Sequence, residues 1–319
     1  MYDPTKRYIP EIERIIKTTW NTRYVRIVDG IMIKNFTAPD AIPHVDGIGT
    51  KGVAHWIHGT YTEAAFDALA QNLNDIPHSI PYALSVGLSL PVDDHPAILE
   101  FTDALATMCR EYDIAYTSGD TAIKDTTDQI EAVVQVLHFM PFLRDKEVVL
   151  EEGDVLIGIA SDGFHASGFS LLRSQLGVQG DRDFVSDITR PTRIYWNVVQ
   201  ELNRLIGIHG PMHISGGAFT RLHRVLGRRL DAVIHRNHSL NPQNIFQDLY
   251  ATGVSDRQMY EMVNCGIGYI VGASRNCGGN ALEIIRYHAM PAAIIGEVVK
   301  GSGRITIESK FSRATVVYE

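Results

Sequence analysis

One local pattern recurs along this chain: a β-branched or apolar run ends in a polar, glycine-containing turn, and a helix-like segment follows. Residues 42–45 run into Asp46 and Gly47, and residues 155–160 run into Ser161 in the same way. Strand-like and helix-like segments that alternate in this manner predict an α/β or α+β fold. Because both halves share the pattern, a distant duplication is one interpretation of the sequence.

The expected elements divide the chain into two halves. In the first half we expect strands at 42–45, 82–90, 114–117 and 130–139, and helices at 62–74 and 96–112. In the second half we expect strands at 155–160, 232–235, 268–271 and 293–308, and helices at 168–176, 193–205, 219–226, 242–252 and 280–288. Residues 144–153 are charged and lack apolar periodicity, and 319 residues are too many for one ordinary core. We therefore expect two domains, at 1–147 and 148–319.

Composition argues against several classes of protein. Hydrophobic residues make up 45% and charged residues 21%, which is globular, and the net charge of −8 disfavours a nucleic-acid partner. The N-terminus has no signal-like apolar region, and no run approaches the ~20 apolar residues of a membrane span. The three cysteines form no CxxC pair, which argues against a zinc site and fits a reducing compartment. We expect a cytoplasmic protein that binds neither nucleic acid nor membrane.

The segment DGIGTK (46–51) directly follows the first expected strand. Its glycines let the backbone approach a ligand and present N–H groups to phosphate oxygens, and Lys51 adds a positive charge. Asp46 offers the carboxylate oxygens that Mg²⁺ prefers. The spacing is not that of a Walker loop. A plain strand-to-loop turn with an exposed lysine agrees about equally well with these residues.

Further acidic residues of the first half lie on or after the helix expected at 62–74. Asn74 and Asp75 end that helix, and on these residues alone a C-cap and turn before Pro77 is the favoured interpretation. Asp67 lies within the same helix and is another candidate acid, although an Asp is merely tolerated within a helix and a solvated face is the favoured interpretation.

Asp120 and Thr121 follow the strand expected at 114–117, again after a glycine. Together with Asp46 and Asp75, Asp120 suggests one shared cleft, since open α/β sheets bind ligands at strand ends. Carboxylates in one cleft repel each other unless cations lie among them. This favours Mg²⁺, and Mg²⁺ together with a lysine favours a polyphosphate.

In the second half, two polar loops each lead into an expected helix. The first, residues 161–168, contains His165, and the second is residues 213–218. Backbone N–H groups at a helix start form an anion site together with the helix dipole. His165 could donate to a phosphate or act as a general acid or base, although an exposed loop histidine is the somewhat stronger interpretation of this residue alone. In the second loop, the alternative is that Ser215 caps the helix and the glycines serve the turn.

Taken in order, these segments resemble the aminoimidazole ribonucleotide synthetase family, the phosphoribosylformylglycinamidine cyclo-ligases. The segments that carry the resemblance are DGIGTK (46–51), FDALAQNLNDI (66–76), EEGDVLIGIASDGFHASGFSLLR (151–173), RPTRIYWNVV (190–199), HISGGAFTRLHRVL (213–226) and MYEMVNCGIGYIV (259–271). They span about residues 42 to 299, and several motifs in the correct order are far more specific than any one of them.

The resemblance implies a two-domain protomer with an N-terminal ATP-binding and dimerisation domain, whose mixed sheet closes a barrel across a homodimer, and a C-terminal α/β domain that binds a phosphoribosyl substrate. ATP and Mg²⁺ are the implied cofactors. The implied nucleotide-binding residues are Gly47, Gly49, Thr50, Lys51, Asn74, Asp75, Asp120 and Thr121, and the implied metal ligands are Asp46, Asp75 and Asp120. The implied substrate-binding residues are His165, Ser167, Ser215, Gly216 and Gly217, and the implied catalytic residues are Asp46, Lys51 and His165.

The implied reaction converts formylglycinamidine ribonucleotide and ATP into aminoimidazole ribonucleotide, ADP and phosphate. The sequence departs from the family pattern at a segment that has only Gly30 in place of several glycines, at Asp120 in a glutamate position, at Ala218 in a glycine position and at residues 221–224. Two alternatives therefore stay open: a divergent paralogue that phosphorylates another amide or small molecule, and a non-catalytic nucleotide-binding protein.

Overall fold

The computed structural model describes residues 6–37, 41–141 and 149–319. The chain divides into two compact units, Met1–Leu143 and Arg144–Glu319, each of which is described by itself. The expected boundary between residues 147 and 148 lies outside the described residues. Both units combine helices with a mixed sheet, so the prediction of a two-domain mixed α/β fold is confirmed.

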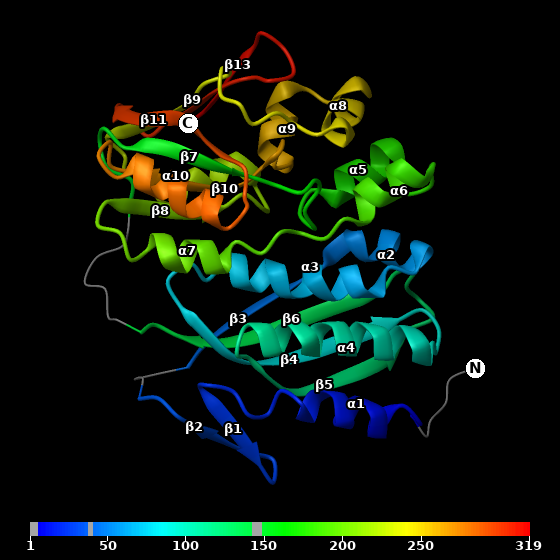
Figure 1. Ribbon diagram of the computed structural model, residues 1–319. Helices are drawn as coiled ribbons and strands as arrows, with labels where there is room; N and C mark the ends of the chain where they lie inside the picture. Colours follow the sequence, from blue (N-terminus) through cyan, green and yellow to red (C-terminus); the bar gives the residue numbers. More distant parts are fainter. Residues whose placement is uncertain (1–5, 38–40, 142–148) are drawn as a thin grey trace. The chain divides into compact units, whose positions relative to one another are not determined.

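The first unit is built on a four-stranded sheet in the order β3-β6-β4-β5. Its elements are α1 (Ile9–Lys17), β1 (Val25–Val28), β2 (Ile31–Lys34), β3 (Ile42–Gly47), η1 (Gly49–Lys51), α2 (Gly52–His58), α3 (Tyr61–Asn74), β4 (Ile80–Leu90), α4 (His95–Glu111), β5 (Ala115–Ile123) and β6 (Glu131–Phe139). The pairs β3–β6 and β6–β4 are antiparallel, and β4–β5 is parallel. Helices α3 and α4 pack together on one face of this sheet (Figure 1).

The opposite face of the four-stranded sheet is partly open. Along β6, buried Val134 and Val136 alternate with exposed Val133 and Gln135, the pattern of a sheet with one packed face. The hairpin β1–β2 turns at Asp29 and Gly30, whose positive φ angles of 51° and 76° suit a two-residue hairpin turn. It covers one end of the sheet through an apolar cluster of Val25, Tyr82, Ala83, Ala115 and Phe139.

The second unit is built on a seven-stranded sheet in the order β13-β12-β9-β11-β7-β10-β8. Its elements are β7 (Val155–Ala160), α5 (Phe169–Leu176), α6 (Arg182–Thr189), α7 (Trp196–Leu202), β8 (Ile208–His213), η2 (Ala218–Arg224), β9 (Leu230–Ile234), α8 (Asn244–Ala251), α9 (Asp256–Met262), β10 (Ile267–Ala273), α10 (Gly278–Tyr287), β11 (Ala292–Lys300), β12 (Ile305–Glu308) and β13 (Thr315–Tyr318). Among the described strand pairs of this second sheet, only β12–β9 is parallel.

The core of the second unit lies under helices α7 and α10 (Figure 1). Ile157, Ile159, Tyr269 and Val271 of the central strands meet Val198 and Val199 of α7 and Ala281 and Ile285 of α10. Every residue of β10 is buried, and a continuous apolar run of this kind is typical of a strand covered on both faces. No helix in the described parts of the chain is long and apolar enough to cross a membrane.

Candidate functional site

The turn after β3 is held against strand β6 by glycine packing. A Cβ on Gly47 would lie 2.7 Å from the carbonyl oxygen of Ala132, and a Cβ on Gly52 would lie 2.0 Å from that of Ile130. Within the turn, the Gly47 N–H donates to Asp46 Oδ1 at 2.7 Å. Gly49 adopts a φ of +54°, which glycine reaches without strain. In DGIGTK, Gly47 therefore permits close packing of the backbone and Gly49 permits a left-handed conformation. Together they set the position of Asp46 at the start of the turn.

Asn72 joins the end of helix α3 to the strand that carries Asp46. Its Oδ1 atom lies 2.9 Å from His44 Nδ1, and its Nδ2 group donates to the Asp46 carbonyl oxygen at 3.3 Å and to the Ala68 carbonyl oxygen at 3.1 Å. Asp75 is the C-cap residue of α3, three residues beyond Asn72, which is roughly 4.5 Å along a helix axis. The structure thus brings the segment with Asn74 and Asp75 next to the strand with Asp46.

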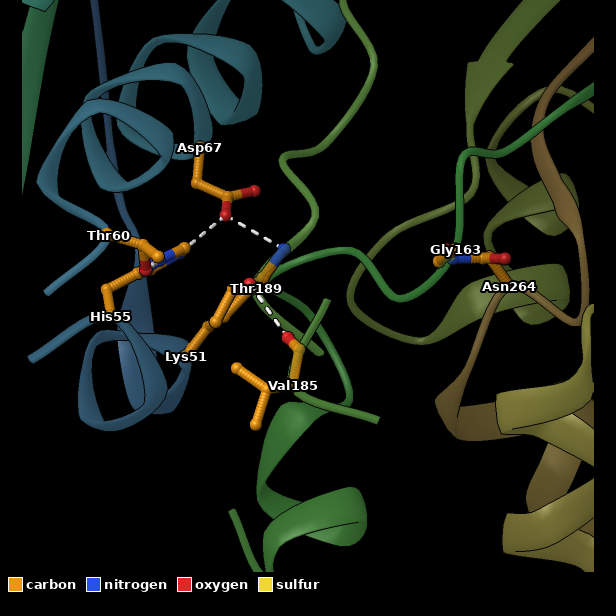
Figure 2. A network of polar contacts seen from close by, with 8 residues as sticks. All are labelled: Lys51, His55, Thr60, Asp67, Gly163, Val185, Thr189 and Asn264. Carbon is orange, nitrogen blue, oxygen red and sulfur yellow. Dashed lines mark hydrogen bonds and ion pairs between the residues drawn. The ribbon is translucent and has the colours of Figure 1, made fainter. Parts of the chain in front are cut away.

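Asp67 does not belong to a solvated face, and that expectation is wrong. Its side chain is fully buried, and its Oδ2 atom lies 2.8 Å from Lys51 Nζ and 2.9 Å from His55 Nε2 (Figure 2). Burial alone would raise the pKa of Asp67, but Lys51 and His55 more than offset this and hold it well below its usual range. Helical periodicity indicates which side of α3 carries Asp67, but it does not indicate which side chains pack against that side.

Lys51 is likewise buried, so the interpretation as an exposed lysine is wrong. Burial lowers the pKa of Lys51, and the Asp67 carboxylate opposes this effect by stabilising the charged amine. The pKa of His55 is also lowered by burial, although its hydrogen bond to Asp67 acts in the opposite direction. Lys51, His55 and Asp67 form a buried cluster of ionisable side chains that begins at the last residue of DGIGTK.

Asp120 lies at the other edge of the sheet. Asp46 pairs across the strands with Val134, Val134 with Val86, and Val86 with Gly119. Three strand spacings separate the two edges by roughly 14 Å. The Asp120 side chain is 83% exposed, and its Oδ1 atom lies 3.4 Å from Lys6 Nζ. Lys6 also donates to the carbonyl oxygen of Thr121 at 2.7 Å.

The structure does not unite the three predicted metal ligands within one chain. Asp46 and Asp75 lie on neighbouring elements, whereas Asp120 lies across the sheet. Among the described residues, no group of three or more His, Cys, Asp or Glu side chains could hold a metal ion. Two carboxylates still fit Mg²⁺, which usually keeps several waters and binds through one or two carboxylates plus substrate phosphates.

In the second unit, the loop 161–168 is anchored by side chains from two other motifs. Asn264 accepts from Ser161 Oγ at 2.8 Å. It also donates to the carbonyl oxygen of Gly163, which lies beside it in Figure 2, at 3.0 Å. Arg193 Nε donates to Asp162 Oδ2 at 2.8 Å. The segments RPTRIYWNVV and MYEMVNCGIGYIV therefore act as supports for this loop, a role that their separate positions in the sequence did not reveal.

His165 is 1% exposed, so the expectation of an exposed loop histidine is wrong. Its ring centroid lies 5.3 Å from that of His213 and 6.3 Å from that of Tyr195. A Cβ on Gly268 would lie 1.9 Å from Tyr195 Oη and 2.8 Å from His165 Cε1, which explains the glycine at this point of β10. His165 is a packed residue of the second unit, surrounded by aromatic and imidazole rings.

The two predicted substrate loops lie close together. A Cβ on Gly216 would lie 3.9 Å from Ser167 Oγ, and Gly216 and Gly217 are both exposed. Ser215 is buried, and its hydroxyl accepts a hydrogen bond from Arg221. The structure thus brings the predicted substrate-binding residues of both loops into one region, with His165 beneath it as a packed neighbour of His213.

The element that follows residues 213–217 differs from the expected helix at 219–226. It is the 3-10 helix η2, and its N-cap residue is Gly217 rather than Ser215. Ala218 has a φ of +42°, so the left-handed conformation occurs here at an alanine. A short 3-10 helix has fewer aligned peptide dipoles than a longer α-helix, so the helix dipole at this position is weaker than expected.

These features define a two-domain α/β protein with a carboxylate- and glycine-rich turn in one unit and two adjacent polar loops in the other. The model of the AIR synthase related protein N-terminal domain matches residues 38–138, and that of the AIR synthase related protein C-terminal domain matches residues 151–308. The chain belongs to this AIR synthase related family.

Curated relatives and solved structures agree with this assignment. A phosphoribosylformylglycinamidine cyclo-ligase of Methanococcus vannielii is 27% identical, covering 86% of this chain and 81% of the relative. The enzyme of the same name from Alkaliphilus metalliredigens is 28% identical, covering 85% and 84%. Thiamine-monophosphate kinase from Stenotrophomonas maltophilia shares the fold with a TM-score of 0.68 at 16% identity, covering 96% of each chain. Hydrogenase maturation protein HypE in complex with ATP has a TM-score of 0.63 at 15% identity, covering 100% of this chain and 95% of that one.

Proposed function

We propose that this protein is an ATP-dependent cyclo-ligase that converts formylglycinamidine ribonucleotide into aminoimidazole ribonucleotide in purine biosynthesis, in the cytoplasm. The observation that carries the proposal is the match of both family domains, together with curated cyclo-ligase relatives of which the chain covers more than four fifths. In the proposed reaction the formyl oxygen attacks the γ-phosphate of ATP and ADP leaves. The amidine nitrogen then closes the imidazole ring as phosphate departs.

The residues of the first unit support ATP and Mg²⁺ binding in this proposal. Asp46 and Asp75 would hold Mg²⁺, which neutralises the transferring phosphoryl group and orients it. The backbone of Gly47, Gly49 and Thr50 would meet the phosphates, and Asn74 would accompany Asp75. Positioning and charge neutralisation are the main requirements of phosphoryl transfer, and this set of side chains suits them.

The loops of the second unit would hold the phosphoribosyl substrate. Gly216 and Gly217 present exposed backbone, and Ser167 adds a hydroxyl beside them. His165 and Ser215 are buried. In this proposal they hold the two loops in shape, and either side chain contacts the substrate only if loop movement exposes it. Arg193 fixes Asp162 and with it the start of the first loop.

We also propose a homodimer formed through the first unit. Val45 and Val133 are 55% and 49% exposed on the open face of the four-stranded sheet, and β3 is an edge strand. Exposed apolar side chains beside a strand edge favour association with another chain. In such a dimer the partner's Asp120 could complete a site that its own chain does not assemble.

A divergent ATP-using paralogue is the second candidate. Asp120 and Thr121 lie in a segment that departs from the cyclo-ligase pattern, and solved structures of a kinase and of an ATP-bound maturation protein share the fold. Such a protein would use the same nucleotide residues on another amide or small molecule. A non-catalytic nucleotide-binding protein would retain binding without turnover.

One coupled assay separates these candidates. Purified protein is incubated with ATP, Mg²⁺ and formylglycinamidine ribonucleotide, and aminoimidazole ribonucleotide and ADP are measured together. We expect both products in equal amounts, no turnover in EDTA, and little turnover with Asp75→Asn. ADP formation that ignores this substrate would favour a paralogue, and nucleotide binding without ADP would favour a non-catalytic protein.

A further inference from the structure

The Oδ2 atom of Asp67 contacts two basic side chains. Lys51 Nζ and His55 Nε2 both approach the same oxygen, Oδ2, at 2.8 Å and 2.9 Å (Figure 2). All three side chains are buried. Loss of the cationic partner of a buried carboxylate strongly destabilises the folded protein, because the cost of removing the carboxylate from water is then uncompensated. Lys51 can therefore leave Asp67 at low cost only if another positive charge replaces it.

His55 is hydrogen-bonded on both ring nitrogens. Nε2 faces Asp67, and Nδ1 lies 2.8 Å from Thr60 Oγ1. Thr60 is the N-cap residue of α3, yet its side chain makes no capping hydrogen bond within the described part of the chain. Its hydroxyl is directed at His55 instead. A hydroxyl can donate to a neutral Nδ1 or accept from a protonated one, so this arrangement satisfies His55 in either protonation state.

We propose that His55 is a positioning residue that allows Lys51 to move to the phosphates of a bound nucleotide, by taking up a proton and becoming the cation that pairs with Asp67. This inference rests on the proposed ATP site. Lys51 keeps its charge and transfers it from Asp67 to the phosphates, and the proton that His55 gains at Nδ1 comes from solvent. Asp67 remains ionised and paired before and after the movement.

The charges around His55 agree with this exchange. Asp67 and Glu63 of α3 favour its protonation, whereas burial and the positive charge of Lys51 oppose it. Departure of Lys51 removes one of the two opposing influences, so the pKa of His55 rises. Nucleotide binding is therefore linked to proton uptake, and it should weaken as the pH rises above the pKa that His55 has in the complex.

The first experiment needs no nucleotide. Lys51→Met removes the charge and keeps a chain of similar length, and the titration of His55 is followed by NMR, with His55→Gln used to assign its signal. We expect the pKa of His55 to rise by about one unit or more relative to the unmodified protein, the scale of a lost neighbouring charge. Lys51→Gln serves as a second variant should Lys51→Met fold poorly. An unchanged titration in a folded variant overturns the proposal.

The matched control is Lys51→Met combined with Asp67→Asn, in which the carboxylate that would hold a protonated His55 is gone. We expect the upward shift to vanish there. A shift that persists without the Asp67 carboxylate means that another group drives it, and this also overturns the proposal.

The second experiment measures the proton directly. ATP with Mg²⁺ is titrated calorimetrically in two buffers of different ionisation enthalpy, at several pH values between about 6 and 8. We expect net proton uptake that is largest between the pKa values of His55 in the free and the bound protein, falls toward zero above both, and is about absent in His55→Gln. Binding without proton uptake overturns the proposal. Failure to bind ATP at all counts against the proposed function instead, and the NMR experiment then decides the role of His55 alone.

Discussion

At the scale of single residues, His165 shows how burial changes what a substitution should do. Its imidazole is enclosed by Tyr195 and His213 and packs against Gly268. His165→Ala should therefore leave a cavity and lower the free energy of unfolding by about 2 kcal/mol or more. Thermal unfolding of the variant measures this loss.

The same variant separates packing from chemistry when turnover is measured per folded molecule. If His165 also assists the proposed reaction, turnover falls by roughly 100-fold, the scale of a general acid or base. A destabilised protein with normal turnover would limit His165 to shaping the loop 161–168. His165→Asn, which keeps part of the volume and a polar group, is the matched comparison for packing loss.

Ala218 carries a testable backbone strain. Its φ of +42° lies in the left-handed region, which costs a residue with a Cβ roughly 1–2 kcal/mol. Glycine avoids this cost but gives up roughly 0.5–1 kcal/mol of unfolded-state entropy. Ala218→Gly should therefore raise the melting temperature by about 0–4 °C for a protein of this size.

The control for Ala218→Gly is Ala104→Gly in the middle of helix α4, where the backbone is helical. There the same substitution should destabilise the protein by about 1 kcal/mol. Equal effects of the two substitutions on the melting temperature would show that the conformation of Ala218 stores no strain.

What the sequence could predict at this scale depends on the type of residue. The roles of the glycines in turns could be predicted from the sequence pattern alone, because a close backbone approach or a positive φ angle is a local requirement. The burial of Asp67 and Lys51 was not predicted, since their pairing depends on how α2 and α3 pack. His55 gave no signal, because a lone histidine in a helix is indistinguishable from an ordinary core or surface residue.

At the scale of elements, Asn72 is the link between α3 and β3. Asn72→Ala should remove the hydrogen bonds to the half-buried His44 and to the Asp46 carbonyl oxygen. Each such loss costs about 0.5–1.5 kcal/mol. We expect weaker binding of ATP with Mg²⁺, by about tenfold, measured by calorimetry.

A double-mutant cycle with His44→Gln tests whether the effect of Asn72→Ala travels through this contact. Residues that share a hydrogen bond should show a coupling energy of about 0.5–3 kcal/mol. Additive losses in ATP affinity would mean that Asn72 acts through α3 alone and does not hold the strand of Asp46.

Some elements could be predicted and others could not. Strands β4, β6 and β7 agree with expectation, because apolar and β-branched runs dominate them. The hairpin β1–β2 was missed, although Asp29-Gly30 between apolar residues is a hairpin signal. At residues 219–226 an α-helix was expected, but the turn that starts at Ala218 continues as 3-10 helix η2, which apolar spacing does not distinguish from an α-helix.

At the scale of the whole molecule, the two-unit organisation followed from chain length and from the charged connector. The homodimer was implied only by the family resemblance, because exposed apolar residues that would support it become visible only once the fold is known. Val45 and Val133 reveal an open sheet face, and the distance across the sheet separates Asp120 from Asp46. Both features are explained together if the proposed site draws on two copies of the chain.

That arrangement has a specific consequence for mixed dimers. Asp46→Asn and Asp120→Asn chains are co-expressed with different affinity tags, and the heterodimer is purified through both. Each homodimeric variant should be nearly inactive in the coupled assay. In the heterodimer one site combines the intact Asp46 of one chain with the intact Asp120 of the other, while the second site carries both substitutions.

We therefore expect the heterodimer to recover about half of the unmodified turnover, as two-fold symmetry with two independent sites requires. If Asp46 and Asp120 acted within one chain, each site would keep one substitution, and the heterodimer would be as inactive as its parents. Light scattering that finds only monomers at micromolar concentration would contradict the dimer itself. Full activity of the Asp120→Asn homodimer would instead remove Asp120 from the site and leave Asp46 and Asp75 as its carboxylates.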